Sequence, residues 1–462
     1  MRLQDTLKNS EQELDVSNKV RIYLCGVTVY DESHVGHART IIIFDVLRKY
    51  LESKGVEVKF IQNFTDVDDK IINRAKLENT TAEEISSRYI KNYFVDFDAL
   101  NVKRASNYPK ATEHIEEIQE FIKKLVEKDI AYISKNGVYF SVEKFPEYGK
   151  LSKKKIDDLQ SGARIEVDET KKDPMDFALW KLSDIEPTWD SPWGKGRPGW
   201  HIECSAMSIK YLGENFDIHG GGRDLIFPHH ENEIAQSESF TSKQFAKIWM
   251  HVGMVTINGD KMSKSLGNIK SIKQVLEKWG PNIIRLFCLS GHYSKPIDYS
   301  EETLKENIIK WRQAEICYYE LVHANLSTNQ SIKEFISIVK KEFDDALEAD
   351  LNTHLALSAF FKLVKETNKR AAEGVLGKSD SETILPEFNR MLQILGLNIP
   401  HISEEEKQRI DEMISKREQL RKEKQFEDAD KIRNKINEMN IEIIDHKGKT
   451  IWVKKERIKA EN

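Results

Sequence analysis

Two histidines near the start of the chain are spaced to act together on a phosphate group. His34 and His37 enclose Gly36 in the tetrapeptide His-Val-Gly-His, between apolar runs at residues 20–24 and 40–54. The first run is typical of a buried strand and the second of a helix. The N-terminus of such a helix offers free N–H groups that attract phosphate, and two imidazoles would add donors there. Gly36 would let a flat group such as an adenine ring approach the backbone.

The same two histidines also have a simpler interpretation. Capping or surface positions would explain them without any chemistry. The loop contains no G-x-G-x-x-G motif and the chain contains no G-x-x-x-x-G-K-[ST] motif, so neither a dinucleotide site nor a P-loop is indicated. A function for these histidines therefore depends on a second motif.

A second candidate phosphate-binding stretch occurs more than two hundred residues later. Lys261 and Lys264 lie three apart in the sequence Lys-Met-Ser-Lys-Ser, after an apolar segment and a turn-forming Asn258-Gly259 pair. Two lysines on such a loop would suit a clamp that places positive charge on a triphosphate. On its own the stretch is equally typical of an exposed basic loop.

A glycine-rich segment offers a third contact for a nucleotide. Residues 215–218 predict a strand that opens into a turn at Gly220-Gly221-Gly222. Gly221 in this turn would allow a nucleotide to lie close to the backbone, and Asp224 would bind ribose hydroxyls. Pro228 is then placed to begin a helix, and His230 on that helix is expected to point away from its neighbour His229.

Four residues offer the soft and borderline donors that suit Zn²⁺: two thiols, one imidazole and one carboxylate. Two helix pairs support the grouping, because residues 200 and 204 share one helix face and residues 229 and 233 share another. The spacing is not that of a zinc finger, so the fold would have to bring the donors together. Each residue taken singly is more typical of an ordinary buried side chain. The four candidates are Cys25, Cys204, His229 and Glu233.

The order of predicted elements defines the fold class. Strand, loop, helix and strand follow one another at the start, which indicates a Rossmann-like α/β catalytic domain with a parallel sheet. Thr65 or Asp66 is expected to cap the next helix, with Asp68 and Asp69 in its first turn. The predicted division is 1–109 and 194–250 for the two halves of the catalytic domain, 110–193 for an inserted α+β subdomain, 251–310 for a linking subdomain, 311–400 for a helical bundle and 404–462 for a small mixed α/β domain.

Composition limits the class of protein further. The 462 residues are 39% hydrophobic, and four cysteines are too few for a disulfide framework, which favours a reducing compartment. No apolar run approaches membrane-spanning length, so a soluble, cytoplasmic protein without a membrane partner is expected. The net charge of -5 means that any nucleic acid must bind to local basic surfaces.

Taken together, residues 34–37 and 261–265 resemble the HIGH and KMSKS signatures of class I aminoacyl-tRNA synthetases. Within that class the chain resembles the cysteinyl-tRNA synthetase family over nearly its whole length. The family combines a Cys just before the HIGH loop with the segments Gly-Trp-His-Ile-Glu-Cys-Ser and Phe-Pro-His-His-Glu-Asn-Glu, which stand here at 199–205 and 227–233. Val35 replaces Ile in HIGH, which removes no donor or ligand.

The resemblance implies an activity, its ligands and roles for individual residues. L-Cysteine and ATP with Mg²⁺ would form cysteinyl-adenylate, and a ribose hydroxyl at the 3′ end of tRNA(Cys) would accept the amino acid. One zinc ion on the four residues above would bind the cysteine thiolate and reject serine. His34, His37, Lys261 and Lys264 would be the catalytic residues, with Lys264 also on ATP. The further substrate contacts would be Gly26, Thr65, Trp200 and His219.

The resemblance also assigns the rest of the chain to RNA. The helical bundle would contact tRNA, and the C-terminal domain would read the anticodon with basic residues and Trp452. A monomer is expected.

Three alternatives remain open at this stage. A ligase that joins cysteine to an amino sugar would share the zinc and ATP sites but lack the C-terminal domain. A nucleotidyltransferase of the HIGH superfamily would not need the two distant cysteines. A non-catalytic RNA-binding paralogue would have lost one of the two signatures.

Overall fold

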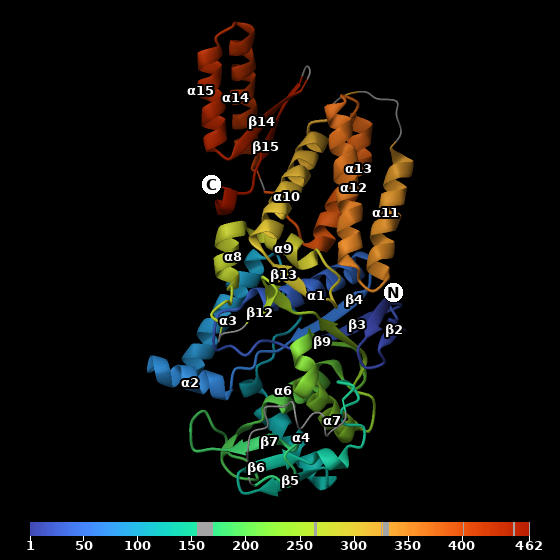
Figure 1. Ribbon diagram of the computed structural model, residues 1–462, viewed down its shortest axis with the longest axis vertical. Helices are drawn as coiled ribbons and strands as arrows, with labels where there is room; N and C mark the ends of the chain where they lie inside the picture. Colours follow the sequence, from blue (N-terminus) through green and yellow to red (C-terminus); the bar gives the residue numbers. More distant parts are fainter. Residues whose placement is uncertain are drawn as a thin grey trace.

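The computed structural model describes residues 1–154, 170–262, 266–324, 326, 332–400, 402–446 and 449–461. Most of the lysine-rich loop at 261–265 lies outside this part: Lys264 is not described, and neither is the side chain of Lys261. The molecule is elongated, with the catalytic domain and its insertion at one end and the C-terminal unit at the other (Figure 1).

A four-stranded parallel sheet forms the centre of the catalytic domain. Its strands are β3 (Lys19–Leu24), β4 (Glu57–Gln62), β9 (Phe216–Gly222) and β10 (Ala246–Val252), in the spatial order β10-β9-β3-β4. β9 follows β3 by almost two hundred residues but pairs directly with it, and Tyr23 lies opposite His219. This arrangement confirms the predicted α/β fold with a parallel sheet.

Helix α1 (Val35–Ser53) connects β3 to β4 and begins five residues earlier than the apolar run at 40–54 indicated. The start lies at Val35 because the His34 side chain caps the helix. Ile41, Ile42, Ile43 and Phe44 are all buried, so α1 is covered on more than one face. Gly220 allows Phe44 to pack closely on β9, since a Cβ there would lie 2.0 Å from the Phe44 ring.

The cap of helix α2 (Asp69–Glu78) differs from the prediction. Asp68 caps it, by accepting a hydrogen bond from the Lys70 backbone, so the expectation of Thr65 or Asp66 was wrong. Thr65 instead continues the extended backbone, exchanging hydrogen bonds with the loop at 27–29. Asp66 accepts from the backbone and hydroxyl of Thr112. Helix α3 (Ala82–Ala99) follows.

The segment between the halves of the catalytic domain folds around an apolar core that also includes Ile202, Ala206 and Ala235 from the second half. Helix α4 (Ile115–Glu127) packs beside an antiparallel sheet in the order β5-β6-β7-β8. The hairpin predicted around Asn136-Gly137 is confirmed. The strands are β5 (Ala131–Ser134), β6 (Gly137–Phe140), β7 (Phe177–Leu182) and β8 (Gly196–Pro198).

The second half of the catalytic domain carries helices α6 (Trp200–Leu212) and α7 (Glu231–Thr241). The three glycines at 220–222 lie inside β9, so the predicted glycine-rich turn was wrong; their backbone pairs with β10 across the sheet. Two short helical turns, η3 (Arg223–Leu225) and η4 (Ile226–His230), join β9 to α7. Pro228 therefore stands in the turn before α7, and Phe227 interrupts the helical geometry there.

The remaining chain continues through a small sheet into helices. The first part contains β11 (Val255–Ile257), β12 (Asp260–Lys261), α8 (Ile272–Trp279), α9 (Pro281–Leu289) and β13 (Ile297–Tyr299). The predicted helical bundle is confirmed by α10 (Glu301–Val322), α11 (Lys333–Glu348), α12 (Thr353–Ala372) and α13 (Lys378–Leu395). The hairpin β1 (Arg2–Asp5) and β2 (Ser10–Glu13) packs on β10 at the edge of the parallel sheet.

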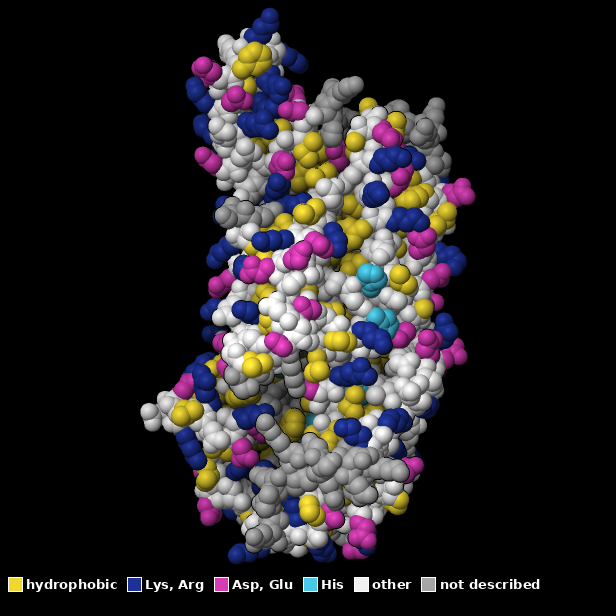
Figure 2. All heavy atoms as spheres, in the orientation of Figure 1, with side chains coloured by type: hydrophobic (Ala, Val, Ile, Leu, Met, Phe, Trp, Pro, Cys, Tyr) yellow, Lys and Arg dark blue, Asp and Glu magenta, His cyan; other side chains and the backbone are white. Residues whose placement is uncertain are grey.

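The C-terminal unit pairs helices α14 (Glu404–Lys422) and α15 (Phe426–Glu438) with strands β14 (Ile441–His446) and β15 (Lys449–Lys454). Its visible face interleaves Lys and Arg with Asp and Glu (Figure 2). Trp452 is only 3% exposed and donates its ring N–H to Asp411, because β15 packs against α14. The expectation that Trp452 faces RNA was therefore wrong. Within the described part of the chain, no helix combines the length and apolar character needed to cross a membrane.

Candidate active site

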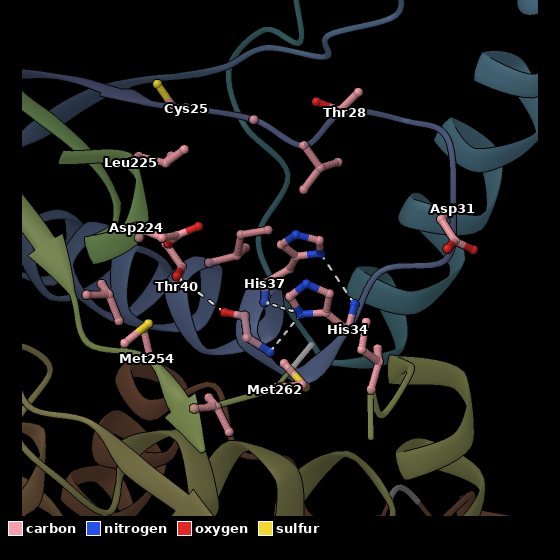
Figure 3. Close-up of a pocket in the computed structure, with 18 of the residues that line it drawn as sticks. Cys25, Thr28, Asp31, His34, His37, Thr40, Asp224, Leu225, Met254 and Met262 are labelled. Atoms are coloured by element: carbon pink, nitrogen blue, oxygen red, sulfur yellow. Dashed lines mark hydrogen bonds between the residues drawn. The ribbon is translucent and has the colours of Figure 1, made fainter. Parts of the chain in front are cut away.

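A pocket of about 410 Å³ opens at the carboxyl ends of β3 and β9, where parallel α/β sheets bind ligands. Its lining includes Cys25 and Trp200 from one side and the histidine pair from the other. Figure 3 shows Cys25 across the cavity from His34 and His37. The pocket therefore joins two of the predicted motifs in one space.

His34 and His37 each use one ring nitrogen, Nδ1, to accept backbone hydrogen bonds at the start of α1. The Nδ1 atom of His34 accepts hydrogen bonds from the backbone of Gly36 and His37 at 3.1 and 3.4 Å. The Nδ1 atom of His37 accepts from the His34 backbone at 3.3 Å, and the two rings stack 3.7 Å apart. A neutral imidazole that accepts at Nδ1 carries its proton on Nε2. Both rings thus hold an N–H donor at the N-terminus of α1, the positive end of the helix dipole.

The residues predicted to contact a nucleotide occupy different places. Gly36 and Asp224 both line the pocket. A Cβ at Gly36 would lie 3.0 Å from the His34 ring, so a larger residue there would crowd the ring that caps the helix. Gly221 does not line the pocket and packs against His230, while its neighbour Gly222 lies at the pocket wall.

The four predicted metal ligands converge. Their donor atoms all lie within 4.8 Å of one another, and all four side chains are buried. The Cys25 and Cys204 sulfurs are 3.8 Å apart, Cys25 Sγ lies 3.3 Å from Glu233 Oε1, and His229 Nε2 lies 3.0 Å from the same oxygen. Donors at tetrahedral Zn–S and Zn–N or Zn–O distances stand about 3.3–3.8 Å apart, so the group has the size of a zinc site.

Contacts within this group favour the charged forms of Cys204, His229 and Glu233. The hydrogen bond from the Cys25 thiol lowers the pKa of Cys204 to about 6. Although burial opposes a charged ring, the Glu233 carboxylate raises the pKa of His229 to about 10. Burial also opposes charge on Glu233, but His219 and His229 hold the pKa of that carboxyl well below its usual range. The set thus provides a thiolate and a carboxylate for a cation.

Two further histidines surround the same group, and one of them was missed. His219 Nε2 donates to Glu233 Oε2 over 2.8 Å, and its Nδ1 atom is buried with no partner among the described residues. His230 Nε2 lies 3.3 Å from Cys25 Sγ, so the expectation that His230 points elsewhere was wrong. The backbone departs from helical geometry at Phe227, just before His229 and His230. His219 and His230, with Cys25 and Glu233, form a second set of potential ligands.

The other predicted substrate contacts lie around the metal end of the pocket. The Trp200 ring packs 4.3 Å from the His229 ring and lines the pocket. Gly26 also lines it, and its backbone N–H donates to the Asn63 side chain at 2.8 Å. Thr65 is 2% exposed and lies outside the pocket lining. Asn63 itself was not predicted, although its place directly after β4 is where such contacts occur.

Comparisons with known proteins agree with this fold. A family model described as the catalytic domain of class I (C) tRNA synthetases matches residues 11–308, and a DALR domain model matches residues 342–399. A solved methionyl-tRNA synthetase of Mycobacterium tuberculosis with methionyl-adenylate superposes with a TM-score of 0.61 at 16% identity, covering 82% of this chain and 89% of that chain. A LeuRS-tRNA-LeuAMS complex from Agrobacterium radiobacter gives 0.61 at 9% identity, covering 83% and 85%. The fold is thus that of a class I tRNA synthetase.

Curated relatives narrow the class to one family. The chain is 48% identical to the cysteine–tRNA ligase of Thermodesulfovibrio yellowstonii, over 98% of this chain and 99% of the relative. It is 46% identical to the cysteine–tRNA ligase of Aquifex aeolicus, over 99% of each. The chain belongs to the cysteine–tRNA ligase family of class I aminoacyl-tRNA synthetases.

Proposed function

We propose that this protein activates L-cysteine with ATP and transfers it to the 3′ end of tRNA(Cys). The observation that carries the proposal is the pocket that joins a thiol-containing donor group to two imidazole N–H donors. One end suits a thiol amino acid and the other suits phosphate, so both reactants of an adenylation would meet in one cavity. Family membership supports the same reaction.

The chain's own residues supply positioning and charge rather than a nucleophile. ATP would lie with its phosphates at the α1 N-terminus, where the Nε2–H groups of His34 and His37 donate as charge develops. Asp224 is placed for ribose hydroxyls at the pocket wall. Lys261 and Lys264 would act on the phosphates, with Mg²⁺ on the triphosphate. The cysteine carboxylate then attacks the α-phosphorus and pyrophosphate leaves.

We assign the zinc ion to Cys25, Cys204, His229 and Glu233 rather than to the overlapping second set. The first set holds two sulfurs, which zinc prefers. Each imidazole of the second set already hydrogen-bonds a member of the first, because His219 contacts Glu233 and His230 contacts Cys25. Bound zinc would supply a Lewis acid that favours a thiolate over a hydroxyl.

Residues around this group would select the amino acid by position. Trp200 would close the pocket over the side chain, and the unpartnered Nδ1 of His219 offers a buried polar contact. Gly26 and Thr65 would border the backbone of the substrate. Such a site rejects serine by the chemistry of its donors, without a separate editing step.

The rest of the chain would serve the RNA. The bundle, which includes the DALR match, would contact tRNA(Cys), and the C-terminal unit would read the anticodon. The domain boundaries given for the sequence, a monomeric state and a cytoplasmic location belong to the same proposal.

The experiment is ATP-dependent charging of unfractionated tRNA with labelled cysteine, with serine in parallel. Charging with cysteine alone is expected. Pyrophosphate exchange with cysteine but no charging would favour the small-molecule cysteine ligase, and neither activity in folded, zinc-containing protein would favour the non-catalytic paralogue.

The zinc assignment is tested with Cys204→Ser. Because serine is a poor zinc ligand, we expect zinc content below half of the wild-type value and cysteine-dependent pyrophosphate exchange at least about 100-fold slower. Cys317→Ala is the matched control, since Cys317 is a buried cysteine in α10 away from the site. Full zinc and activity in Cys204→Ser would contradict the assignment.

A further inference from the structure

A chain of hydrogen bonds runs from the candidate zinc ligand Cys25 to the N-terminal hairpin. His230 Nε2 lies 3.3 Å from Cys25 Sγ, and its Nδ1 lies 2.8 Å from His251 Nε2. His251 Nδ1 in turn lies 2.8 Å from the hydroxyl of Thr6. His230 is fully buried and His251 is 3% exposed, so water does not compete along the chain.

The direction of these bonds follows from the donors and acceptors available. A thiolate bound to zinc accepts only, so His230 must donate from Nε2 and accept at Nδ1. His251 must then donate from Nε2 and accept at Nδ1. Thr6 has a hydroxyl that can donate to that nitrogen, so each N···N or N···O contact carries one proton and both rings are neutral. The thiolate sets this direction, and a hydrogen bond donated by the Thr6 hydroxyl at the far end stabilises the same tautomers of both rings.

The hairpin that carries Thr6 is itself fixed to the sheet. The Thr6 backbone N–H donates to the carbonyl of Trp249 at 2.9 Å, and the Trp249 N–H donates to the Asp5 carboxylate at 2.9 Å. Asp5 is fully buried and also accepts from the Leu7 and Lys8 backbone. These bonds hold the Thr6 hydroxyl in place beside His251.

The second histidine at the site provides a contrast. His219 contacts Glu233 with Nε2, but its Nδ1 has no partner among the described residues. Within the described residues, His219 therefore has no second hydrogen bond behind the one to Glu233, whereas His230 has one to His251. His219 and His230 thus differ in whether a second hydrogen bond holds the ring on the side away from the metal group.

We propose that Thr6, His251 and His230 form a positioning relay that directs an N–H onto the Cys25 sulfur and so stabilises the thiolate as a metal ligand. The relay rests on the proposed zinc assignment. Outer hydrogen-bond partners of metal ligands commonly change metal affinity by about 10- to 100-fold when removed. The N-terminal hairpin would thereby be a part of the metal centre, about 19 residues before its first ligand in the sequence.

The test compares Thr6→Val with Thr6→Ser in the full-length protein. Valine keeps the shape of threonine but cannot donate, whereas serine keeps the hydroxyl. We expect zinc transfer to a colorimetric chelator to be about 10-fold faster for Thr6→Val than for wild type, and unchanged for Thr6→Ser. In the cobalt-substituted proteins, the sulfur-to-metal charge-transfer band should move in Thr6→Val alone. His251→Phe, which breaks the relay at its middle, should show both effects.

Each result decides between specific claims. Equal zinc release and equal cobalt spectra for Thr6→Val, His251→Phe and wild type would overturn the relay while leaving the zinc assignment standing. Wild-type protein purified without zinc and unable to take it up would overturn the zinc assignment and the relay together. A loss of melting temperature common to Thr6→Val and Thr6→Ser, with no spectral change, would show a merely structural role for Thr6.

Discussion

At the scale of single residues, the proposed function gives one side chain of the site, that of His34, two tasks through two different atoms. The Nδ1 atom of His34 caps α1 by accepting backbone hydrogen bonds, and we propose that its Nε2–H donates to phosphate when ATP binds. Capping and phosphate binding are therefore not competing interpretations of this histidine. The same division holds for His37, whose Nδ1 accepts from the His34 backbone.

The two tasks of His34 can be separated by substitution. Asparagine is among the preferred N-cap residues but lacks the Nε2 donor, so His34→Asn should keep the unfolding free energy within about 0.5 kcal/mol of wild type. Its rate of cysteine-dependent pyrophosphate exchange should fall about 10²- to 10³-fold. His34→Ala, which loses the cap as well, should also lose about 1 kcal/mol of stability in chemical denaturation. An active His34→Asn would refute the role of Nε2.

At the scale of elements, α1 is attached to the linking segment by one arginine. Arg39 is fully buried and donates to five backbone carbonyls. Two of these, Gly253 and Met254, lie just after β10, and the others lie at residues 292, 293 and 295, before β13. Burial lowers the pKa of Arg39 to about 10, which still leaves it charged at neutral pH. The guanidinium therefore holds the two segments that lead into β11 and into β13.

Replacing Arg39 should measure this attachment. Lysine keeps the charge but has three donors without the planar fork, so Arg39→Lys should lower the unfolding free energy by about 2 kcal/mol or more. The half-exposed Arg88, paired with Glu78 on the surface, is the control, and Arg88→Met should change the unfolding free energy far less than Arg39→Lys does. Urea denaturation followed by tryptophan fluorescence gives both values, and equal losses in the two variants would contradict the assignment.

At the scale of the whole molecule, a buried junction connects the C-terminal unit to the rest. Glu456, just after β15, accepts from the Asn282 side chain at 2.7 Å, near the start of α9. Its backbone N–H donates to Glu315 at 2.7 Å, and its carbonyl accepts from Arg312 at 2.8 Å, both on α10. Asn282 also bonds Asn398 beyond α13, so one site connects three parts of the chain. The position of the C-terminal unit is thus linked to helices next to the catalytic domain.

The junction should weaken as pH rises. Burial, with a further contribution from the nearby Glu315 carboxylate, raises the pKa of Glu456 to about 7 from an ordinary 4.5. The folded state therefore holds a proton that the unfolded state releases above pH 4.5, so the stabilisation is complete at low pH. It falls by up to about 1.4 kcal/mol per pH unit as pH rises toward 7. The Arg312 guanidinium acts to lower the pKa of Glu456, but burial outweighs it.

Hydrogen exchange of the β14 and β15 amides will show this dependence. At each pH the protection in wild type is compared with that in Glu456→Gln, a neutral isostere, which cancels the intrinsic pH effect on exchange. The ratio should fall between pH 5 and 7.5. A ratio that is constant with pH would mean that Glu456 does not titrate in this range.

Features that depend on residues close together in the sequence could be predicted from short motifs. Local periodicity predicted the strand before the His-Val-Gly-His pattern and the helix after it, although the helix begins earlier than expected. It also placed His229 and Glu233 on one helix face, where they are in contact. The four metal donors were also identified by type. These features depend on residues a few positions apart, where backbone geometry alone decides which side chains share a face.

Other features depended on contacts between distant segments. Cys25 and Cys204 stand 179 positions apart and meet because α6, which carries Cys204, packs against β3, which Cys25 directly follows. His230 faces the site because the turn at Phe227 departs from helical geometry, and Trp452 is covered because β15 packs on α14. Periodicity within one segment carries no information on which other segment will lie against it. The sequence by itself therefore determined the reacting groups and their local elements, while tertiary packing decided which of them meet, which are supported from behind and which are buried.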